Sequence, residues 1–277
     1  MLFIIFIIGI LLLRRASRGL SRAELIGFAL PTGLAATTLI MLSMDWGGIA
    51  LSRTNLLILT LTLLAASLAL NADMLRSIFK IKSIKPLHLK DEALRRTLER
   101  QQWSWINIVW VLMLMAAVYI EYVNIAKCLT YPTYDRDSMA AFDTFGYVCA
   151  REGTYIRMSL FDPNYIPSLH HAGSAMGYMP MLQLSYAYVY AFGAATSKAV
   201  PAMMYIGFLV GFYGLCRRKM THTGAMTALL GVVMTPEMTS FASHSMTNVM
   251  HACVASAAMI YFCLWIERQR RSELTMA

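Results

Sequence analysis

Charged residues are scarce in this sequence. They make up 14% of its 277 residues, whereas hydrophobic residues make up 58%. An ordinary soluble domain is about 25% charged and about 45–50% apolar. A larger core cannot absorb the difference, because the core fraction grows slowly with chain length. The scarcity of charge excludes an ordinary soluble protein and indicates surplus apolar surface that faces lipid.

The sequence also lacks the short motifs of several enzyme and transporter classes. It contains no Gly-rich phosphate loop, no HExxH metal motif and no GxSxG nucleophile turn. Its apolar runs carry no series of acidic residues of the kind that lines an ion path. No function therefore follows directly from a motif of these kinds.

The five cysteines have no metal-ligand spacing. Three of them lie in apolar runs, where cysteine usually behaves as a small hydrophobic residue. Cys128 and Cys149 fall in one long polar loop. If that loop is extracytoplasmic, the two could form a disulfide, although nothing else in the loop requires a covalent link.

Long apolar runs are abundant, and each predicts a helix that crosses a membrane. Such a helix needs about 20 largely apolar residues, at a rise of about 1.5 Å per residue. The first run is too short to cross comfortably. Its basic residues follow the apolar stretch, whereas in a signal peptide they precede it. We predict seven spans, near residues 1–13, 24–44, 54–72, 103–124, 199–216, 221–240 and 246–266.

The basic residues predict the orientation of these spans. The formal net charge is +9, but the charges cluster between apolar runs, which indicates cytoplasmic anchors rather than a nucleic-acid surface. If the segment 176–195 does not cross, most of the 24 Lys and Arg residues lie inside, those of the polar stretch 73–102 among them. The positive-inside bias favours this arrangement. We therefore expect 176–195 to be an interfacial or re-entrant helix on the outer face, with its tyrosines at headgroup level.

Together these features predict an all-α polytopic membrane protein of a bacterial inner membrane. We expect about seven transmembrane helices, one outer-face interfacial helix and one long extracytoplasmic loop over 125–198. Residues 1–102 would hold N-terminal transmembrane helices and a cytoplasmic basic loop. Residues 103–277 would hold the outer loop and three further spans after it.

The outer loop opens with two carboxylates, Asp135 and Asp137, directly after the fourth predicted span. Carboxylates here could act as a general base or hold a divalent cation, and no other cofactor is indicated. Two acids separated by one residue can both reach a metal in a tight turn. A bare D-x-D is a weak signal, however, and Asp137-Ser138 could instead cap a helix over 139–151. Both interpretations stay open at this point.

Basic residues in the same loop run against the orientation bias. Arg136, Arg151, Arg157 and Lys198 all lie on the side that positive-inside topology disfavours. Such charges are typical of a site for an anion, and a phosphate at the outer bilayer surface fits this place. The alternative is ion pairing with the acids of the same loop, and spacing alone does not decide between the two.

Two further groups are candidates for the same site. His170 and His171 precede the predicted interfacial helix, and adjacent helical side chains diverge by about 100°, so only one of them would approach Asp135. Glu237 lies near the outer end of the sixth span, and His244 follows it. Ionisable groups at the edge of a span tend to face a polar cavity, although exposed interfacial side chains would fit as well.

The segment DRDSMAAFDTFGYVCAREGTY resembles the type C (GT-C) membrane glycosyltransferases, the family of protein mannosyltransferases and aminoarabinose transferases. In that family a span leads into an outer loop that opens with an acidic motif, matched here by Asp135 and Asp137. The likeness covers about residues 103–266. Its later elements are matched by Ala150-Arg151-Glu152-Gly153, by Tyr178-Met179-Pro180 of the interfacial helix, and by Thr235-Pro236-Glu237.

The resemblance implies that a sugar moves from a polyprenyl-phosphate carrier in the membrane to an envelope acceptor, with inversion at the anomeric carbon. Asp135 or Asp137 would deprotonate the acceptor hydroxyl, and Arg151 or Arg157 would neutralise the departing phosphate. The other residues of the substrate site would be Arg136, His170, His171 and Glu237.

Two departures from the family pattern leave an alternative open. The family often carries an aspartate where this sequence has Thr247-Asn248, and it continues through more spans than the seven predicted here. The alternative is an inactive fragment or a non-catalytic membrane scaffold derived from such a transferase. A half that depends on a partner membrane subunit would also fit. No nucleic-acid partner is expected.

Overall fold

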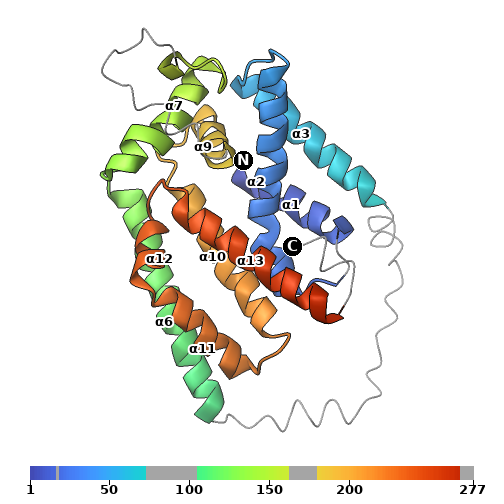
Figure 1. The fold of residues 1–277 in the computed structure, drawn as a ribbon, viewed down its shortest axis with the longest axis vertical. Helices are drawn as coiled ribbons and strands as arrows, with labels where there is room; N and C mark the ends of the chain where they lie inside the picture. Colours follow the sequence, from blue (N-terminus) through green and yellow to red (C-terminus); the bar gives the residue numbers. More distant parts are fainter. Residues whose placement is uncertain (17–18, 73–104, 162–179, 269–277) are drawn as a thin grey trace, which may run out of the picture.

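The structure is a computed structural model of residues 1–277, and it describes residues 1–16, 19–72, 105–161 and 180–268. Every regular element in these ranges is a helix (Figure 1). The predicted all-α class is therefore confirmed for this part of the chain. The polar stretch 73–102, with the predicted boundary at 102, lies outside the described residues.

The long helices form a bundle, and the short helices of residues 143–152 and 181–191 lie at one end of it (Figure 1). In chain order the elements are α1 (Leu2–Ala16), α2 (Arg22–Trp46), α3 (Arg53–Leu70), α6 (Trp105–Thr130), the π-helix η1 (Ser138–Phe142), α7 (Asp143–Glu152), the 3-10 helix η2 (Ser159–Phe161), α9 (Met181–Ala191), α10 (Ala199–Cys216), α11 (His222–Val233), α12 (Pro236–Phe241) and α13 (Asn248–Arg268).

Five of the helices are long and apolar enough to span a membrane. They are α2, α3, α10, the part Asn107–Thr130 of α6 and the part Asn248–Ile266 of α13. Since α1 has 15 residues and α11 has 12, the total of seven spans stays a prediction. The predicted span 221–240 is divided: α11 ends at Val233 and Pro236 begins α12, because proline lacks the N–H that a continuing helix would use.

A buried ion pair joins the start of α2 to the end of α10. Ser21 and Glu24 form a capping box, in which the Glu24 carboxylate accepts a hydrogen bond from the Ser21 N–H at 2.6 Å. Arg218 follows α10 and donates to both oxygens of this carboxylate, at 2.6 and 3.0 Å. Glu24 is fully buried. A two-pronged contact of this kind fixes the two helix ends relative to each other.

Helix α2 crosses α1 and α10 at separations that only glycine permits. A Cβ added at Gly27 would lie 2.3 Å from the Gly211 nitrogen. In the same way, a Cβ added at Gly9 would lie 1.8 Å from the Ala29 oxygen. The backbones therefore touch, as they do where small residues line the interface of membrane helices. These two crossings make α2 the central helix of the bundle.

A proline contributes to the crossing of α2 and α10. Pro31 has no N–H, so the carbonyl of Gly27, four residues earlier, receives no helical hydrogen bond. A Cβ added at Gly207 would lie 2.6 Å from that carbonyl oxygen. A Cα–H of Gly207 therefore points at it, and this weak contact replaces part of the lost bond.

Two apolar clusters share α1, α2, α10 and α13. The first also joins α3, α7 and α9, with Leu34 and Phe145 among its buried members. The second also joins α6 and α11, with Phe28 and Tyr205 among its buried members. Each cluster draws residues from both 1–102 and 103–277, so the two predicted segments share their cores.

The expectation that Tyr186 and Tyr188 lie among lipid headgroups is wrong. Both are fully buried, as is the whole of 182–189 in α9. A Cβ added at Gly146 would lie 2.4 Å from Tyr186 Cβ, so α7 and α9 are in contact. The Tyr188 hydroxyl forms a 2.8 Å hydrogen bond with Thr60 Oγ1 of α3. A tyrosine can be buried where another helix supplies such a partner; the re-entrant alternative for this segment stays a prediction.

The substitution Gly27→Ala should destabilise the protein by about 1–3 kcal/mol, because the added methyl group meets backbone atoms that can move only if α2 and α10 separate. Gly231→Ala is the matched control in α11, where nothing lies within 4 Å of the added Cβ. This control should be neutral, or stabilising by up to about 1 kcal/mol. Thermal unfolding of both variants in detergent measures the difference, and equal melting temperatures would contradict the close crossing.

Candidate functional site

Three chain segments meet at one end of the bundle, which we call the polar end. They are residues 131–137 after α6, 192–198 between α9 and α10, and 242–247 between α12 and α13. A side-chain hydrogen bond joins each segment to each of the other two: Lys198 to Tyr131, Tyr134 to His244, and Ser197 to Ser245. Segments far apart in the sequence thus bring their polar side chains into one cluster.

The carboxylate of Asp143, the first residue of α7, connects this cluster. Its Oδ1 accepts hydrogen bonds from the Tyr190 hydroxyl at 2.6 Å and from Ser197 Oγ at 2.5 Å. Its Oδ2 accepts from Thr133 Oγ1 at 3.3 Å. Ser197 Oγ also lies 2.7 Å from Ser245 Oγ. Burial raises the pKa of Tyr190 to about 12, and the hydrogen bond to Asp143 acts in the same direction, so this tyrosine remains a donor.

Lys198 is a buried cation within the polar end. Its side chain is 3% exposed, and its Nζ donates to the carbonyl oxygen of Tyr131. Because it directly follows Ser197, the Asp143 network also fixes its position. An ammonium group has three N–H donors, and a buried charge is costly unless it is paired. Lys198 therefore offers both charge and hydrogen bonds to an anion.

His244 lies beside the same group. Its Nε2 and the Tyr134 hydroxyl share a 2.8 Å hydrogen bond, and the two rings meet edge to face at 5.1 Å. Its Nδ1 is buried, with no hydrogen-bond partner among the described residues. Burial lowers the pKa of His244 below its usual value; the charge of Asp135 opposes this shift, and those of Lys127 and Lys198 add to it. The ring is therefore more easily kept neutral than an exposed histidine.

The two predicted catalytic aspartates differ in their surroundings. Asp135 is half-buried, and its Oδ1 accepts a hydrogen bond from the Ser138 N–H at 2.7 Å. Asp137 is exposed and makes no capping hydrogen bond with its side chain. The predicted cap at this helix start is therefore provided by Asp135 rather than by Asp137. Asp135 lies near the cluster, because it directly follows Tyr134, whose hydroxyl is hydrogen-bonded to His244.

The suggested metal site at Asp135 and Asp137 finds no third protein ligand. Within the described ranges, no group of three or more His, Cys, Asp or Glu side chains is arranged to hold an ion. Divalent cations with oxygen ligands usually take six or more of them. Since one Asp135 oxygen is already a helix cap, the residues present do not fit a built metal site, and no chemical step is derived through one.

The predicted phosphate-binding arginines are not gathered around Asp135. Arg151 lies at the far end of α7, where its Nε donates to the Tyr147 hydroxyl at 3.1 Å and its guanidinium lies 5.2 Å from the centre of that ring. Roughly 20 Å of helical rise separates it from the start of η1. Arg157 is exposed beyond α7, and Arg136 is exposed beside Asp135.

The structure describes Glu237, Cys128 and Cys149 among the remaining candidates, but not the two adjacent histidines. Glu237 is exposed on α12. His170 and His171 lie outside the described residues. Cys128 and Cys149 are both buried free thiols, so the conditional disulfide between them is not formed.

An aspartate that the sequence analysis did not single out holds the segment after α7. Asp45, near the end of α2, is buried and accepts hydrogen bonds from Thr154 Oγ1 at 2.8 Å, and from the N–H groups of Tyr155 and Ile156 at 2.7 Å each. The Leu51 N–H also donates to the Gly153 oxygen at 2.6 Å. The sequence signal for this role is an acid next to the end of an apolar run. The sequence does not reveal its hydrogen-bond partners, because they lie over a hundred residues away.

Unpartnered polar atoms indicate that the cluster has capacity for a ligand or for water. The hydroxyls of Ser138 and Tyr186 are fully buried and, like His244 Nδ1, have no hydrogen-bond partner among the described residues. Burial raises the pKa of Tyr186 well above its usual value, and the charges of Asp143 and Asp135 add to this. Buried polar groups in folded proteins nearly always find a partner in protein, water or ligand. These atoms mark where such a partner would bind.

Lys198 and His244 both appeared in the sequence analysis, but neither was assigned to the site. The signal for Lys198 was a basic residue kept on the disfavoured side of the membrane, and for His244 an ionisable group at the edge of a span. Neither signal identified the hydrogen-bond partners of these residues, which come from distant parts of the chain.

Comparison of the chain with models of known protein families, with curated proteins and with solved structures finds no match. The geometry of the polar end is therefore the basis for any function assigned to this chain.

The stability of the protein should fall on acidification through the usual histidine pKa, in part because of His244. Its pKa is lowered in the folded state, so between that value and about 6.5 the unfolded chain binds a proton that the folded chain does not. The contribution of His244 to the free energy of unfolding is therefore fully present above about pH 6.5 and is lost as the pH falls below that value.

The melting temperature measured from pH 8 to pH 5 should depend less steeply on pH in His244→Gln than in the unaltered protein. The matched control is His251→Gln, since His251 is exposed. The control should keep the full dependence. A slope unchanged by His244→Gln would show that this histidine is not held neutral.

Proposed function

We propose that this chain is an integral-membrane glycosyltransferase, which moves a sugar from a polyprenyl-phosphate carrier to an envelope acceptor. The observation that carries the proposal is the half-buried carboxylate of Asp135 in segment 131–137, which is hydrogen-bonded to the buried Lys198 through Tyr131 and to the buried His244 through Tyr134. The cluster lies where α6 ends and where α10 and α13 begin, at the ends of three candidate membrane spans. A lipid-linked phosphate presented at a membrane surface would meet a base and a cation together.

The reaction needs one base and one stabiliser of negative charge. Asp135 takes the proton of the acceptor hydroxyl, whose oxygen then forms a bond to the anomeric carbon of the sugar. The bond between that carbon and the phosphate oxygen breaks, and the carrier leaves as a phosphate that keeps the electron pair. Attack from the face opposite the phosphate inverts the anomeric carbon. Charge that develops on the leaving oxygen is stabilised best by donors already in place.

Lys198 suits that second role better than Arg151 or Arg157. It is buried at the polar end. Because water is excluded there, the effective dielectric constant is low and the attraction between the ammonium group and a phosphate is stronger. Arg151 lies in the last turn of α7 and Arg157 lies beyond that helix, and both are exposed. We therefore assign the phosphate to Lys198, and we keep the two arginines for contacts with the rest of a substrate or with anionic headgroups.

The proposed setting is the outer face of a bacterial inner membrane, with the polar end extracytoplasmic. The positive-inside distribution of Lys and Arg supports this orientation. The ion pair of Glu24 and Arg218 lies at the opposite ends of α2 and α10, next to the basic segments that favour the cytoplasm.

A non-catalytic scaffold is the second candidate, and one observation favours it. The hydrogen bond from the Ser138 N–H to Asp135 gives that aspartate a purely structural task as a helix cap. A protein in which Asp135 only caps a helix would not need a base. The substitutions below distinguish the two candidates.

The substitution Asp135→Asn should lower the transfer rate by about 10²–10⁴-fold, which is the usual contribution of a general base. Asparagine accepts the same capping hydrogen bond, so the fold should be retained. Asp137→Asn is the matched control and should keep most of the activity, because Asp137 is exposed and makes no cap. The assay follows sugar transfer from a polyprenyl-phosphate sugar to acceptor by the purified protein in vesicles.

Equal activities of the Asp135→Asn and Asp137→Asn proteins would remove Asp135 as the base. Absence of transfer by the unaltered protein, with every donor sugar and acceptor tried, would favour the scaffold.

The substitution Lys198→Met should weaken binding of polyprenyl phosphate about tenfold or more, since removing a charge-assisted contact to a buried anion costs roughly 1.5–3 kcal/mol. Arg151→Met, the matched loss of a positive charge at the exposed end of α7, should leave binding nearly unchanged. Equilibrium binding to detergent-solubilised protein measures both. A larger loss in Arg151→Met than in Lys198→Met would return the phosphate site to the arginines.

A further inference from the structure

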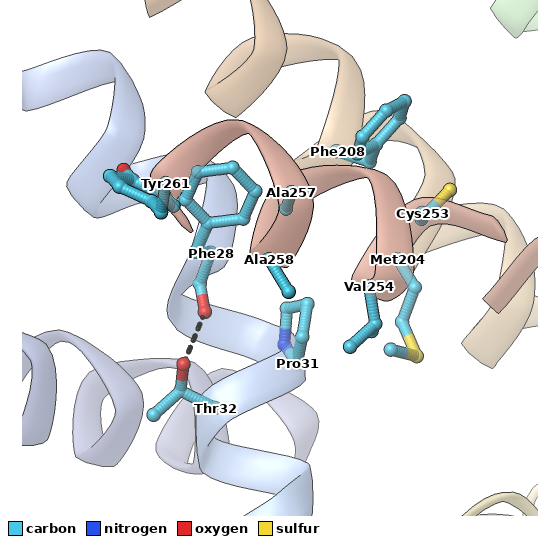
Figure 2. A pocket seen from close by; sticks show the side chains of 10 residues that line it. All are labelled: Phe28, Pro31, Thr32, Met204, Phe208, Cys253, Val254, Ala257, Ala258 and Tyr261. Carbon is cyan, nitrogen blue, oxygen red and sulfur yellow. Dashed lines mark hydrogen bonds between the residues drawn. The ribbon is translucent and has the colours of Figure 1, made fainter. Parts of the chain in front are cut away.

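A separate cleft of about 160 Å³ lies between α2, α10 and α13 (Figure 2). Pro31 of α2, Met204 of α10, and Val254 and Ala258 of α13 are among the side chains that line it. Ala258 and Val254 lie across the cleft from Pro31 (Figure 2). None of the residues assigned to the proposed transfer reaction belongs to this lining.

The cleft is closed at one end and open along one side. Phe28 and Tyr261 meet edge to face at 5.9 Å at the end nearer Glu24, and the Arg218 guanidinium lies 5.7 Å from the centre of the Tyr261 ring. From Cys253 to Tyr261 the wall runs about 12 Å along α13. Val254 on the rim is 46% exposed, so the cleft opens to the outside of the bundle there.

The lining is suited to hydrocarbon. The side-chain hydroxyl next to Pro31, that of Thr32, already donates to the carbonyl oxygen of Phe28 at 2.8 Å, as the dashed line in Figure 2 shows. The remaining side chains around it are apolar, apart from the tyrosine that closes the end. Apolar cavities of about 150 Å³ stay dry and bind small hydrocarbons. Such a site selects its ligand by shape and apolar contact.

We propose that the acyl chain of a bilayer phospholipid occupies this cleft. The open side lies on α13, one of the candidate spans, where Val254, Met259 and Phe262 are all exposed. Lipid chains would cover this face in a membrane, and one chain can enter sideways without leaving the bilayer. Because the lining offers no group that selects a headgroup, the most abundant chain fills it. The phospholipid chain would then support α2 at Pro31, where α2 lacks a backbone hydrogen bond.

Native mass spectrometry of the detergent-purified protein tests this proposal directly. The unaltered protein should retain a bound phospholipid. Ala258→Phe, which fills the cleft, should retain about fivefold less or lower still, as expected when binding loses roughly 1 kcal/mol or more to overpacking. Ala255→Phe is the matched control on the exposed side of α13 and should retain the same amount as the unaltered protein.

Alkylation of Cys253 gives a second measurement on the unaltered protein, so the test does not depend on the folding of a variant. Cys253 is buried on the cleft wall. N-ethylmaleimide should modify it faster after delipidation and more slowly once phospholipid is restored, with the modified residue located by peptide mass spectrometry. Each of three results would overturn the proposal. They are equal retention of phospholipid by all three proteins, retention of polyprenyl phosphate without phospholipid, and a rate of Cys253 alkylation that does not change with lipid.

Discussion

The carboxylate of Asp143 is the interaction on which the polar end depends. It accepts hydrogen bonds from Tyr190 and Ser197, and Ser197 is in turn bonded to Ser245. Lys198 follows Ser197 in the chain, and His244 precedes Ser245, so one carboxylate positions both of the groups that we assign to the neighbourhood of Asp135. The stabilising free energy of such a hydrogen-bond network can exceed the sum of its pairwise bonds.

The glycine crossings of α2 fix the positions of its two ends within the bundle. Because α2 touches the backbones of α1 and α10, its Glu24 end meets Arg218 and its other end brings Asp45 to the segment after α7. The cleft lined by Pro31 lies beside this crossing, between α2, α10 and α13.

Much of the fold could be predicted from the sequence, and less of the site. Apolar runs predict helices because length and hydropathy are local properties, and the five candidate spans follow from them. The burial of Tyr186 and Tyr188 could not be predicted, since it depends on α7 and α3 as neighbours. Asp135 was identified by its place after a span. Lys198, His244 and Asp143 were visible as residues, but Tyr131, Tyr134 and Tyr190, to which they are hydrogen-bonded, lie 47 to 110 positions away from them.

In the proposed function, the polar end faces the outside of the membrane, where a lipid-linked sugar is presented. Cysteine accessibility in intact cells tests it most directly, with Asp137→Cys at the exposed start of η1 and Lys219→Cys beyond α10 at the opposite end. A membrane-impermeant maleimide should label position 137 without permeabilisation and position 219 only after it, with the unaltered protein as the background. Labelling of position 137 only after permeabilisation would place Asp135, Lys198 and His244 in the cytosol and contradict the proposed transfer at the outer face.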